Sequence, residues 1–277
     1  MSGRPMSDVR TTAVDEALAA ALPPGSLYAV GGRVRDELRS QHERVPVPAK
    51  DLDYVVLGVE RDDLLERLRR VGPADVVGAS FAVVKVLVAG TSVDVALPRR
   101  ERSTGAGHRD FAVDSGPGIP LEDDLARRDF RMNMMARRLP DGDVVDPYDG
   151  AADIRAKRID VLRIEAFEED PLRMLRACQF GARFEFSISE RTLKAMRAAA
   201  PLVQTVSAER VRDEIAKFLV AAPRPSRGIE LMREAGLLPP TSCRRSPRAS
   251  ASSKTSIIST TCIAITWRPS IPSHPAT

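Results

Sequence analysis

The pattern of apolar and polar positions in the first half of the chain predicts strands that alternate with a few helices. Short apolar runs at residues 27–30 and 54–57 have the length of buried strands. Two β-branched runs, residues 81–88 and 92–97, flank an Ala-Gly-Thr turn and predict a hairpin. Leucines recur at helical spacing over residues 64–68, so a helix is expected to pack on the resulting sheet.

The second part of the chain has mostly the pattern of amphipathic helices. Residues 192–199, 207–219 and 229–238 each predict one. Two further helices are expected earlier, over residues 14–22 and 121–136. The second of these has acids in its first turn and arginines after them, which the helix dipole favours.

Three stretches have no such pattern. Residues 39–49 are polar and contain two prolines, and residues 99–107 are basic and glycine-containing, so both are expected to be loops, the second a mobile one. Residues 241–277 are rich in Ser, Thr, Pro and Arg and contain no acid. We expect this tail to be a disordered extension or a frameshifted reading in place of a truncated C-terminal part.

Charge and composition narrow the classes of protein. The formal net charge is +4, but the tail alone carries +5, so the other 240 residues sum to −1 and bulk charge does not indicate RNA binding. No apolar run reaches the roughly 20 residues that span a bilayer, and no signal peptide is evident, so a cytoplasmic protein is expected. Three scattered cysteines and three histidines predict neither a disulfide framework nor a zinc site.

Paired acids mark the first candidate site. Asp51 and Asp53 lead into the run 54–57, and alternation along a strand places both carboxylates on one face. Two such charges repel unless a cation lies between them, and Mg²⁺ prefers carboxylate oxygens. Asp94 lies between apolar neighbours in the middle of a predicted strand, so it faces either solvent or the same site.

A pair of glycines marks the second candidate site. Gly31-Gly32 ends the run 27–30, and Arg35 and Asp36 are expected in the first turn of a following helix. Free N–H groups at such a turn bind phosphate, although many glycine pairs mark ordinary turns.

Four stretches together carry a resemblance. They are Ala29-Val30-Gly31-Gly32-Arg33-Val34-Arg35-Asp36, Lys50-Asp51-Leu52-Asp53, Arg127-Arg128-Asp129-Phe130 with Asn133, and Glu169-Asp170-Pro171-Leu172-Arg173 with Arg176. In this order they resemble the class II tRNA nucleotidyltransferase and bacterial poly(A) polymerase family of the DNA polymerase beta superfamily. The resemblance ends at Pro240, and Gln179 stands where relatives often have a further arginine.

The resemblance implies an α+β fold. A nucleotidyltransferase head, a mixed sheet with helices on one side, would span residues 1–150, and an all-helical neck would span residues 151–240. The implied activity is addition of C and A from CTP and ATP to the 3′ end of tRNA, with Mg²⁺ as cofactor and pyrophosphate as product. The implied catalytic residues are Asp51, Asp53 and Asp94, of which Asp51 and Asp53 hold the metal. The implied nucleotide-binding residues are Gly32, Arg35, Arg128, Asp170, Arg173 and Arg176.

Residues of the neck are expected to select the base. Asp170 suits a helix N-cap with Pro171 at the first helical position, and Arg173 and Arg176 then share one face. A carboxylate accepts hydrogen bonds and an arginine donates them, so Asp170 and Arg173 together complement the base edge of C or A.

Two alternatives stay open. A poly(A) polymerase, or an enzyme that adds only CC or only A, has the same head motifs. An inactive nucleotide- or RNA-binding remnant belongs to another class and would account for the altered C-terminus. A dinucleotide-binding oxidoreductase is disfavoured, because the chain has no Gly-x-Gly-x-x-Gly motif.

Overall fold

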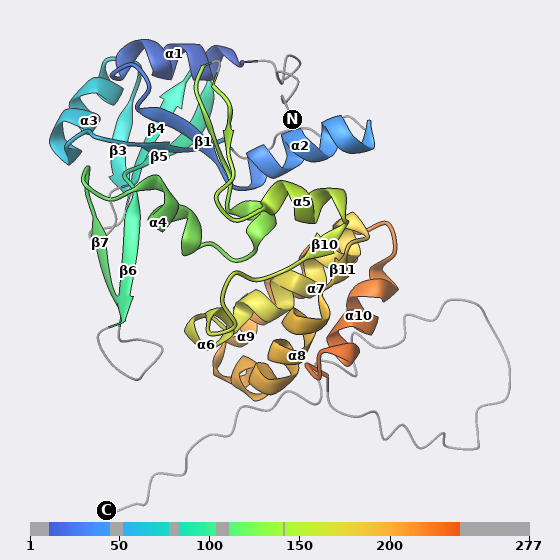
Figure 1. The fold of residues 1–277 in the computed structure, drawn as a ribbon. Coiled ribbons are helices and arrows are strands. Elements are labelled where there is room, and N and C mark those ends of the chain that lie inside the picture. The colour runs from blue at the N-terminus through green and yellow to red at the C-terminus, as the bar shows by residue number, and fades with distance from the viewer. Residues whose placement is uncertain (1–10, 45–51, 78–82, 104–110, 141, 239–277) are drawn as a thin grey trace, which may run out of the picture.

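The computed structural model describes residues 11–44, 52–77, 83–103, 111–140 and 142–238. Asp51 and the tail 241–277 lie outside these residues. Figure 1 shows a part built around a sheet, with a group of helices beside it. The α+β prediction is confirmed.

A seven-stranded sheet forms the centre of the first part, in the order β3-β4-β5-β2-β1-β8-β9. Only β2 and β5 pair in parallel among these neighbours, so the sheet is mixed, as predicted. Its strands are β1 (Leu27–Val30), β2 (Asp53–Val56), β3 (Ala74–Val77), β4 (Val83–Val88), β5 (Thr91–Ala96), β8 (Ala136–Arg138) and β9 (Val144–Val145).

The predicted hairpin is β4 and β5. Ala89 and Gly90 form its turn with positive φ angles of 48° and 77°, the conformation that matches the twist of a two-residue hairpin. A second hairpin follows, made of β6 (Arg99–Ser103) and β7 (Phe111–Ser115). The expectation of a loop from residue 99 was therefore wrong for β6, and residues 104–110 lie outside the described part.

Helices cover both faces of the sheet, which corrects the expectation of one side. The helices of this part are α1 (Ala13–Ala21), α2 (Gly32–Glu43), α3 (Arg61–Arg69) and α4 (Leu121–Ala126). Leu18 of α1 and Leu64 of α3 join the main core with the strand residue Val56. Leu125 of α4 joins a smaller cluster with Val55, on the opposite face. Figure 1 shows α4 across the sheet from α1 and α3.

Two expectations about helix length were wrong. Residues 121–136 form the short α4, a 3₁₀ turn (Arg131–Asn133) and the start of β8. The Asp129 carboxylate accepts a hydrogen bond from the Phe130 N–H, and the Met135 carbonyl accepts one from Gly31, so other bonds replace those of a continuous helix. Conversely, α2 continues to Glu43, into the stretch expected to be a loop.

The second part of the described chain is helical, with one pair of two-residue strands, β10 (Arg158–Ile159) and β11 (Ser187–Ile188). Its helices are α5 (Gly150–Arg155), α6 (Ala166–Glu169), α7 (Leu172–Phe184), α8 (Glu190–Ala199), α9 (Ala208–Ala221) and α10 (Pro225–Glu234), with a 3₁₀ segment (Ala200–Thr205) after α8. A side chain at Gly181 would clash with Leu231, because its Cβ would lie 2.5 Å from Leu231 Cδ1, so α7 and α10 pack closely.

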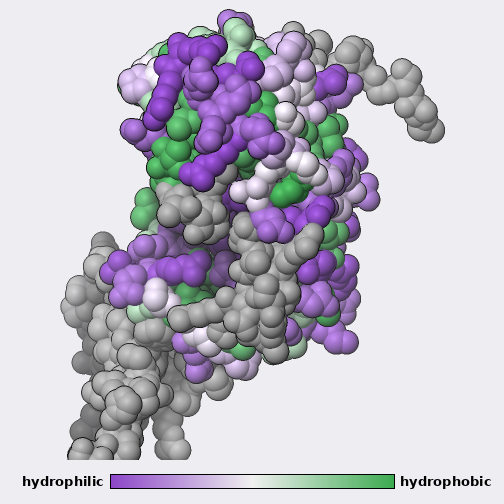
Figure 2. Space-filling model, turned by 90° about the vertical axis from the view of Figure 1, so that its left-hand side faces the viewer, coloured by the Kyte–Doolittle hydropathy of each residue, from purple (hydrophilic) through white to green (hydrophobic). Residues whose placement is uncertain are grey.

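The main core continues from the sheet into these helices and includes Phe180 and Leu231. On the side drawn in Figure 2, hydrophilic residues cover much of the surface, with apolar residues in patches between them. None of the described helices is long and apolar enough to cross a membrane.

Candidate functional site

Two carboxylates lie side by side on the α4 face of the sheet. Asp53 on β2 is the register partner of Asp94 on β5, and neighbouring residues of adjacent strands share a face. Tyr54 and Val95, one position further along each strand, join the main core on the other face. The prediction that Asp94 faces the same site as Asp53 is thus compatible with the register.

This pair offers oxygen ligands of the kind that a hard divalent cation takes. Asp53 is exposed, and Asp94 Oδ1 is a buried atom that accepts no hydrogen bond from the described residues. Lys85 Nζ lies 3.2 Å from this oxygen as an ion pair. Within the described ranges, no cluster of three or more His, Cys, Asp or Glu could hold a metal ion. Two carboxylates with water and phosphate suffice for Mg²⁺, so the residues present fit the group.

The glycine pair forms a sharp turn at the end of β1. Gly31 has φ 68° and donates its N–H to the Met135 carbonyl. A Cβ at Gly31 would lie 2.6 Å from Arg128 Nη1, so only glycine allows the guanidinium of Arg128 this close to the turn. Arg128 Nη2 donates to Asp124 at 3.1 Å, while its Nε is buried without a hydrogen-bond partner among the described residues. The guanidinium of Arg128 is thus held beside the glycine turn by Asp124.

Arg35 is the first member of a series of hydrogen bonds that leads from α2 to α7. Its Nε and Nη2 donate to Asp36 at 2.8 and 2.9 Å, and its Nη1 donates to Asn133 Oδ1 at 2.8 Å. The guanidinium carbon also lies 4.7 Å from the centre of the Phe184 ring. Arg35 is therefore held between α2 and α7, with an exposed fraction of 5%.

Asp129 connects this series to the helical part. Asn133 Nδ2 donates to Asp129 Oδ1 at 2.7 Å, and Arg176 Nε donates to Asp129 Oδ2 at 2.8 Å. Burial alone raises the pKa of Asp129, but the charge of Arg176 and the hydrogen bond from Asn133 outweigh it and hold that pKa below its usual range. The carboxylate thus stays ionised between two predicted site residues, Arg35 and Arg176.

The predicted base-selecting residues lie at the start of α7. Asp170 Oδ1 accepts a hydrogen bond from the Leu172 N–H at 3.2 Å. Because α7 begins at Leu172 with Pro171 as its N-cap residue, the expected places of Asp170 and Pro171 are each off by one residue. Arg210 of α9 lies 3.6 Å from the same oxygen. Arg173 Nη2 donates to the Arg127 carbonyl at 2.8 Å, next to Arg128. Arg173 therefore binds the same segment that holds the glycine turn.

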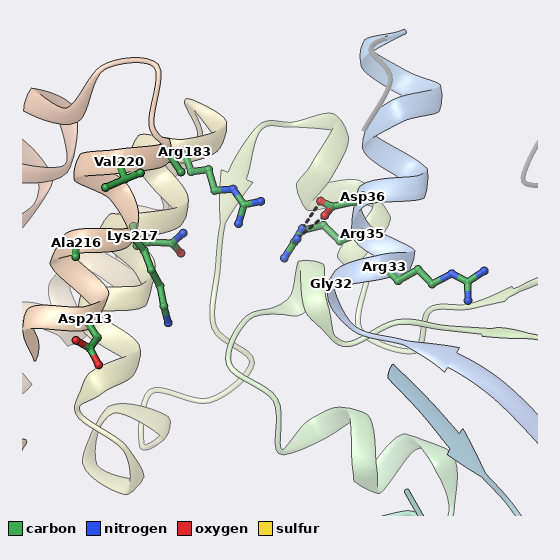
Figure 3. Close-up of a pocket in the computed structure, with 11 residues that line it drawn as sticks. Gly32, Arg33, Arg35, Asp36, Arg183, Asp213, Ala216, Lys217 and Val220 are labelled. Atoms are coloured by element: carbon green, nitrogen blue, oxygen red, sulfur yellow. Dashed lines mark hydrogen bonds and ion pairs between the residues drawn. The ribbon is translucent and has the colours of Figure 1, made fainter. Parts of the chain in front are cut away.

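A cavity of about 700 Å³ opens between α2, α7 and α9. Gly32 and Arg35 line it, and the other predicted site residues do not. Figure 3 shows the side chain of Arg183 extending from α7 toward Arg35 and Asp36. The sequence analysis did not mention Arg183, and it gave no role to the linking residues Asp129 and Asn133. These two belong to the motif Arg127-Arg128-Asp129-Phe130 with Asn133, but only Arg128 of that motif was assigned a function.

Two domain families match the chain. Residues 27–160 match the "Poly A polymerase head domain", and residues 185–241 match a domain described as "Probable RNA and SrmB- binding site of polymerase A". The multifunctional CCA protein of Burkholderia lata is 41% identical over 223 residues, which cover 77% of this chain and 50% of that protein. The protein of the same name from Azoarcus sp. is 42% identical over 216 residues, which cover 76% of this chain and 48% of that protein. The chain thus spans about half the length of these relatives.

Solved structures agree with these matches. The Bacillus stearothermophilus CCA-adding enzyme in complex with CTP superposes with a TM-score of 0.63 at 30% identity, covering 76% of this chain and 48% of that one. The Thermotoga maritima CCA-adding enzyme complexed with tRNA has a TM-score of 0.62 at 27% identity. The match covers 83% of this chain and 55% of that one. Fold, motif geometry and sequence identity lead to one conclusion: the chain belongs to the family of CCA-adding tRNA nucleotidyltransferases and bacterial poly(A) polymerases.

Proposed function

We propose that this chain transfers nucleotidyl groups from CTP and ATP to the 3′ end of tRNA and releases pyrophosphate. The observation that carries the proposal is the register pairing of Asp53 with Asp94, on the sheet face covered by α4, which leads to Arg128. Relatives named multifunctional CCA proteins, and similar enzymes solved with CTP and with tRNA, support it. The proposal includes a head over residues 1–150, a neck over residues 151–240 and a cytoplasmic location.

Carboxylates form the catalytic part of the proposal. Asp53 and Asp94, with Asp51 from outside the described residues, would hold divalent cations, for which we propose Mg²⁺. Such an ion supplies charge neutralisation at the α-phosphate and lowers the pKa of an attacking hydroxyl. The carboxylates themselves repel phosphate, so they would help to position the RNA 3′ end and the α-phosphate only by holding such ions.

Cationic and donor groups form the binding part. Arg128, whose Nη1 lies close to Gly31, would bind the triphosphate together with Gly32 and Arg35. Asp170 and Arg173 would read the base edge, and Arg176 would seat the nucleotide from its place beside Asp129. Arg173 also binds the Arg127 carbonyl, so base and phosphate contacts would be built on one rigid segment.

Poly(A) synthesis is the second candidate, because the first domain match is to a poly(A) polymerase head. The test is incorporation of each labelled nucleotide, with Mg²⁺, onto tRNA ending before CCA, tRNA ending after CC, and an unstructured RNA. Ordered addition of C, C and A supports CCA synthesis, whereas long A tracts on every RNA support poly(A) synthesis. Addition of only CC or only A identifies a partial enzyme. If the folded chain incorporates no nucleotide into any of the three RNAs, both proposed activities are contradicted and the inactive remnant is supported.

A further inference from the structure

The cavity between α2, α7 and α9 contains more positive charge than the predicted site residues account for. Arg33, Arg35, Arg183 and Lys217 all line it. Three of these side chains form ion pairs with carboxylates, at distances of 2.6 to 2.8 Å. The pairs are Arg33 with Asp15, Arg35 with Asp36 and Lys217 with Glu214.

Arg183 differs from the other three. Its contact in the described structure is with the neighbouring Phe184 ring, whose centre lies 5.2 Å from the guanidinium carbon. No described carboxylate forms an ion pair with it, and the two acids that line the cavity, Asp36 and Asp213, are already paired with Arg35 and Arg212. Figure 3 shows Arg183 reaching into the cavity and Arg33 turned away from it. Arg183 is therefore the cationic group of this cavity that is available to a ligand.

The opposite wall of the cavity favours an anion. Gly32 is the first residue of α2, a helix of 12 residues, and its N-terminus attracts negative charge. Figure 3 shows Arg183 directed toward the first turns of α2, where Asp36 is already paired with Arg35, and the cavity of about 700 Å³ has room for several phosphate groups. Gln179, one helical turn before Arg183, lines the same cavity as a neutral, buried side chain. The chain therefore places its cation one turn later on the same helix.

We propose that Arg183 binds the β- and γ-phosphates of the incoming nucleoside triphosphate, opposite Gly32. The inference rests on the proposed function, since it names a further residue for the same substrate. Arginine suits this role because its planar donors match phosphate oxygens. A positive charge in the last turn of α7 stabilises the helix whether or not a ligand binds. The test must therefore measure phosphate binding rather than protein stability.

The experiment measures dissociation constants of CTP, CMP and inorganic tripolyphosphate by calorimetry, using the 277-residue chain. Arg183→Gln is expected to weaken CTP and tripolyphosphate by about tenfold, the effect of one charge-assisted hydrogen bond, and to leave CMP unchanged. Arg69→Gln removes the same charge from an exposed position on α3 and should change none of the three. Gln179→Arg in the Arg183→Gln background should recover CTP affinity.

Three outcomes overturn the inference: equal CTP affinity in wild type and Arg183→Gln, equal weakening of CMP, or no binding of CTP and tripolyphosphate by the wild type. If Arg183→Gln does not fold, Arg183→Met keeps the aliphatic contact with Phe184 and gives the same comparison. A wild-type chain that binds CTP but incorporates nothing contradicts the proposed activity, while the difference between CTP and CMP still decides the role of Arg183.

Discussion

The two faces of the head sheet use the same kinds of charged residue for opposite purposes. On the face covered by α1 and α3, Asp15 is fully buried and accepts hydrogen bonds from Arg33 at 2.6 and 2.7 Å and from the Tyr54 hydroxyl at 2.7 Å. On the other face, Asp53 is exposed beside Asp94.

The difference lies in whether the oxygens are already satisfied. Burial alone raises the pKa of Asp15, but the hydrogen bonds from Arg33, the Thr12 N–H and Tyr54, with the charge of Arg33, together outweigh it and lower that pKa to about 2. The charge of Asp15 is thus neutralised within the fold, and it stabilises the protein. Asp94 Oδ1 forms an ion pair with Lys85 at 3.2 Å, but both side chains are about half exposed and the oxygen accepts no hydrogen bond from the described residues, so its charge is less fully compensated than that of Asp15. The exposure of these carboxylates therefore marks the candidate site better than their charge alone.

The largest expected effect is on activity, at Asp53. Asp53→Ala removes a carboxylate that the fold does not bury, so nucleotide incorporation should fall by roughly a thousandfold or more while the thermal midpoint stays unchanged. Asp75→Ala, an exposed acid on β3 of the same sheet, is the matched control and should keep full activity. Retained incorporation by Asp53→Ala would remove Asp53 from the catalytic group.

The second effect is on stability, at Asp15. Asp15→Ala leaves Arg33 buried without its main partner, so the free energy of unfolding in urea should fall by about 3 kcal/mol or more. Asp15 also completes the capping box of α1 with Thr12, which adds to the loss. Glu16→Ala, an exposed neighbour on α1, should cost little. An unchanged unfolding free energy in Asp15→Ala would show that this network does not stabilise the head.

A smaller effect follows from pH. The folded pKa of Asp15 is about 2, below the value of about 3.9 in an unfolded chain, so its contribution is complete above pH 4 and is lost as pH falls toward 2. About 1 kcal/mol should be lost by pH 3 and about 2 kcal/mol by pH 2. The stability difference between wild type and Asp15→Ala, measured in urea at each pH, should shrink accordingly. A constant difference would contradict the lowered pKa.

The smallest effect is on selectivity, at Arg173. Arg173→Ala should reduce the preference for CTP and ATP over UTP and GTP by about tenfold, because one reading contact is lost. Affinity for the triphosphate itself should change less. Competition kinetics with all four nucleotides measure this, with Arg155→Ala on the exposed side of α5 as control. Unchanged selectivity would leave Arg173 a structural role, through its hydrogen bond to the Arg127 carbonyl and its ion pair with Glu169.

Much of the fold was predictable because local patterns agreed with the final packing. The β4–β5 hairpin, α3 and the three later helices follow from β-branched runs, turn residues and helical repeats. The stretch 121–136 did not, because tertiary contacts overrode its helical pattern: Met135 bonds to Gly31, and the chain enters β8. A hydrogen bond between residues so far apart in the sequence cannot be predicted from the local spacing of apolar residues.

The candidate site was predictable to a similar degree. Motif resemblance found Gly32, Arg128 and Arg173, and the register of β2 with β5 then put Asp94 beside Asp53. The motif resemblance named Arg35 and not Arg33, but it did not reveal that Arg33 binds Asp15 behind the sheet while Arg35 binds Asn133 toward α7. Nor did it reveal Arg183, because a cation that has no ion pair among the described residues is recognised only once the neighbouring carboxylates are placed.

The central claim is that this chain catalyses nucleotidyl transfer with the carboxylates of the α4 face. The most direct measurement is pyrophosphate release from CTP in the presence of Mg²⁺ and tRNA that ends before CCA, for wild type and Asp53→Ala. The account predicts release in step with C addition by the wild type, and loss of both in the variant. Pyrophosphate release by the folded wild type no faster than by Asp53→Ala would contradict it.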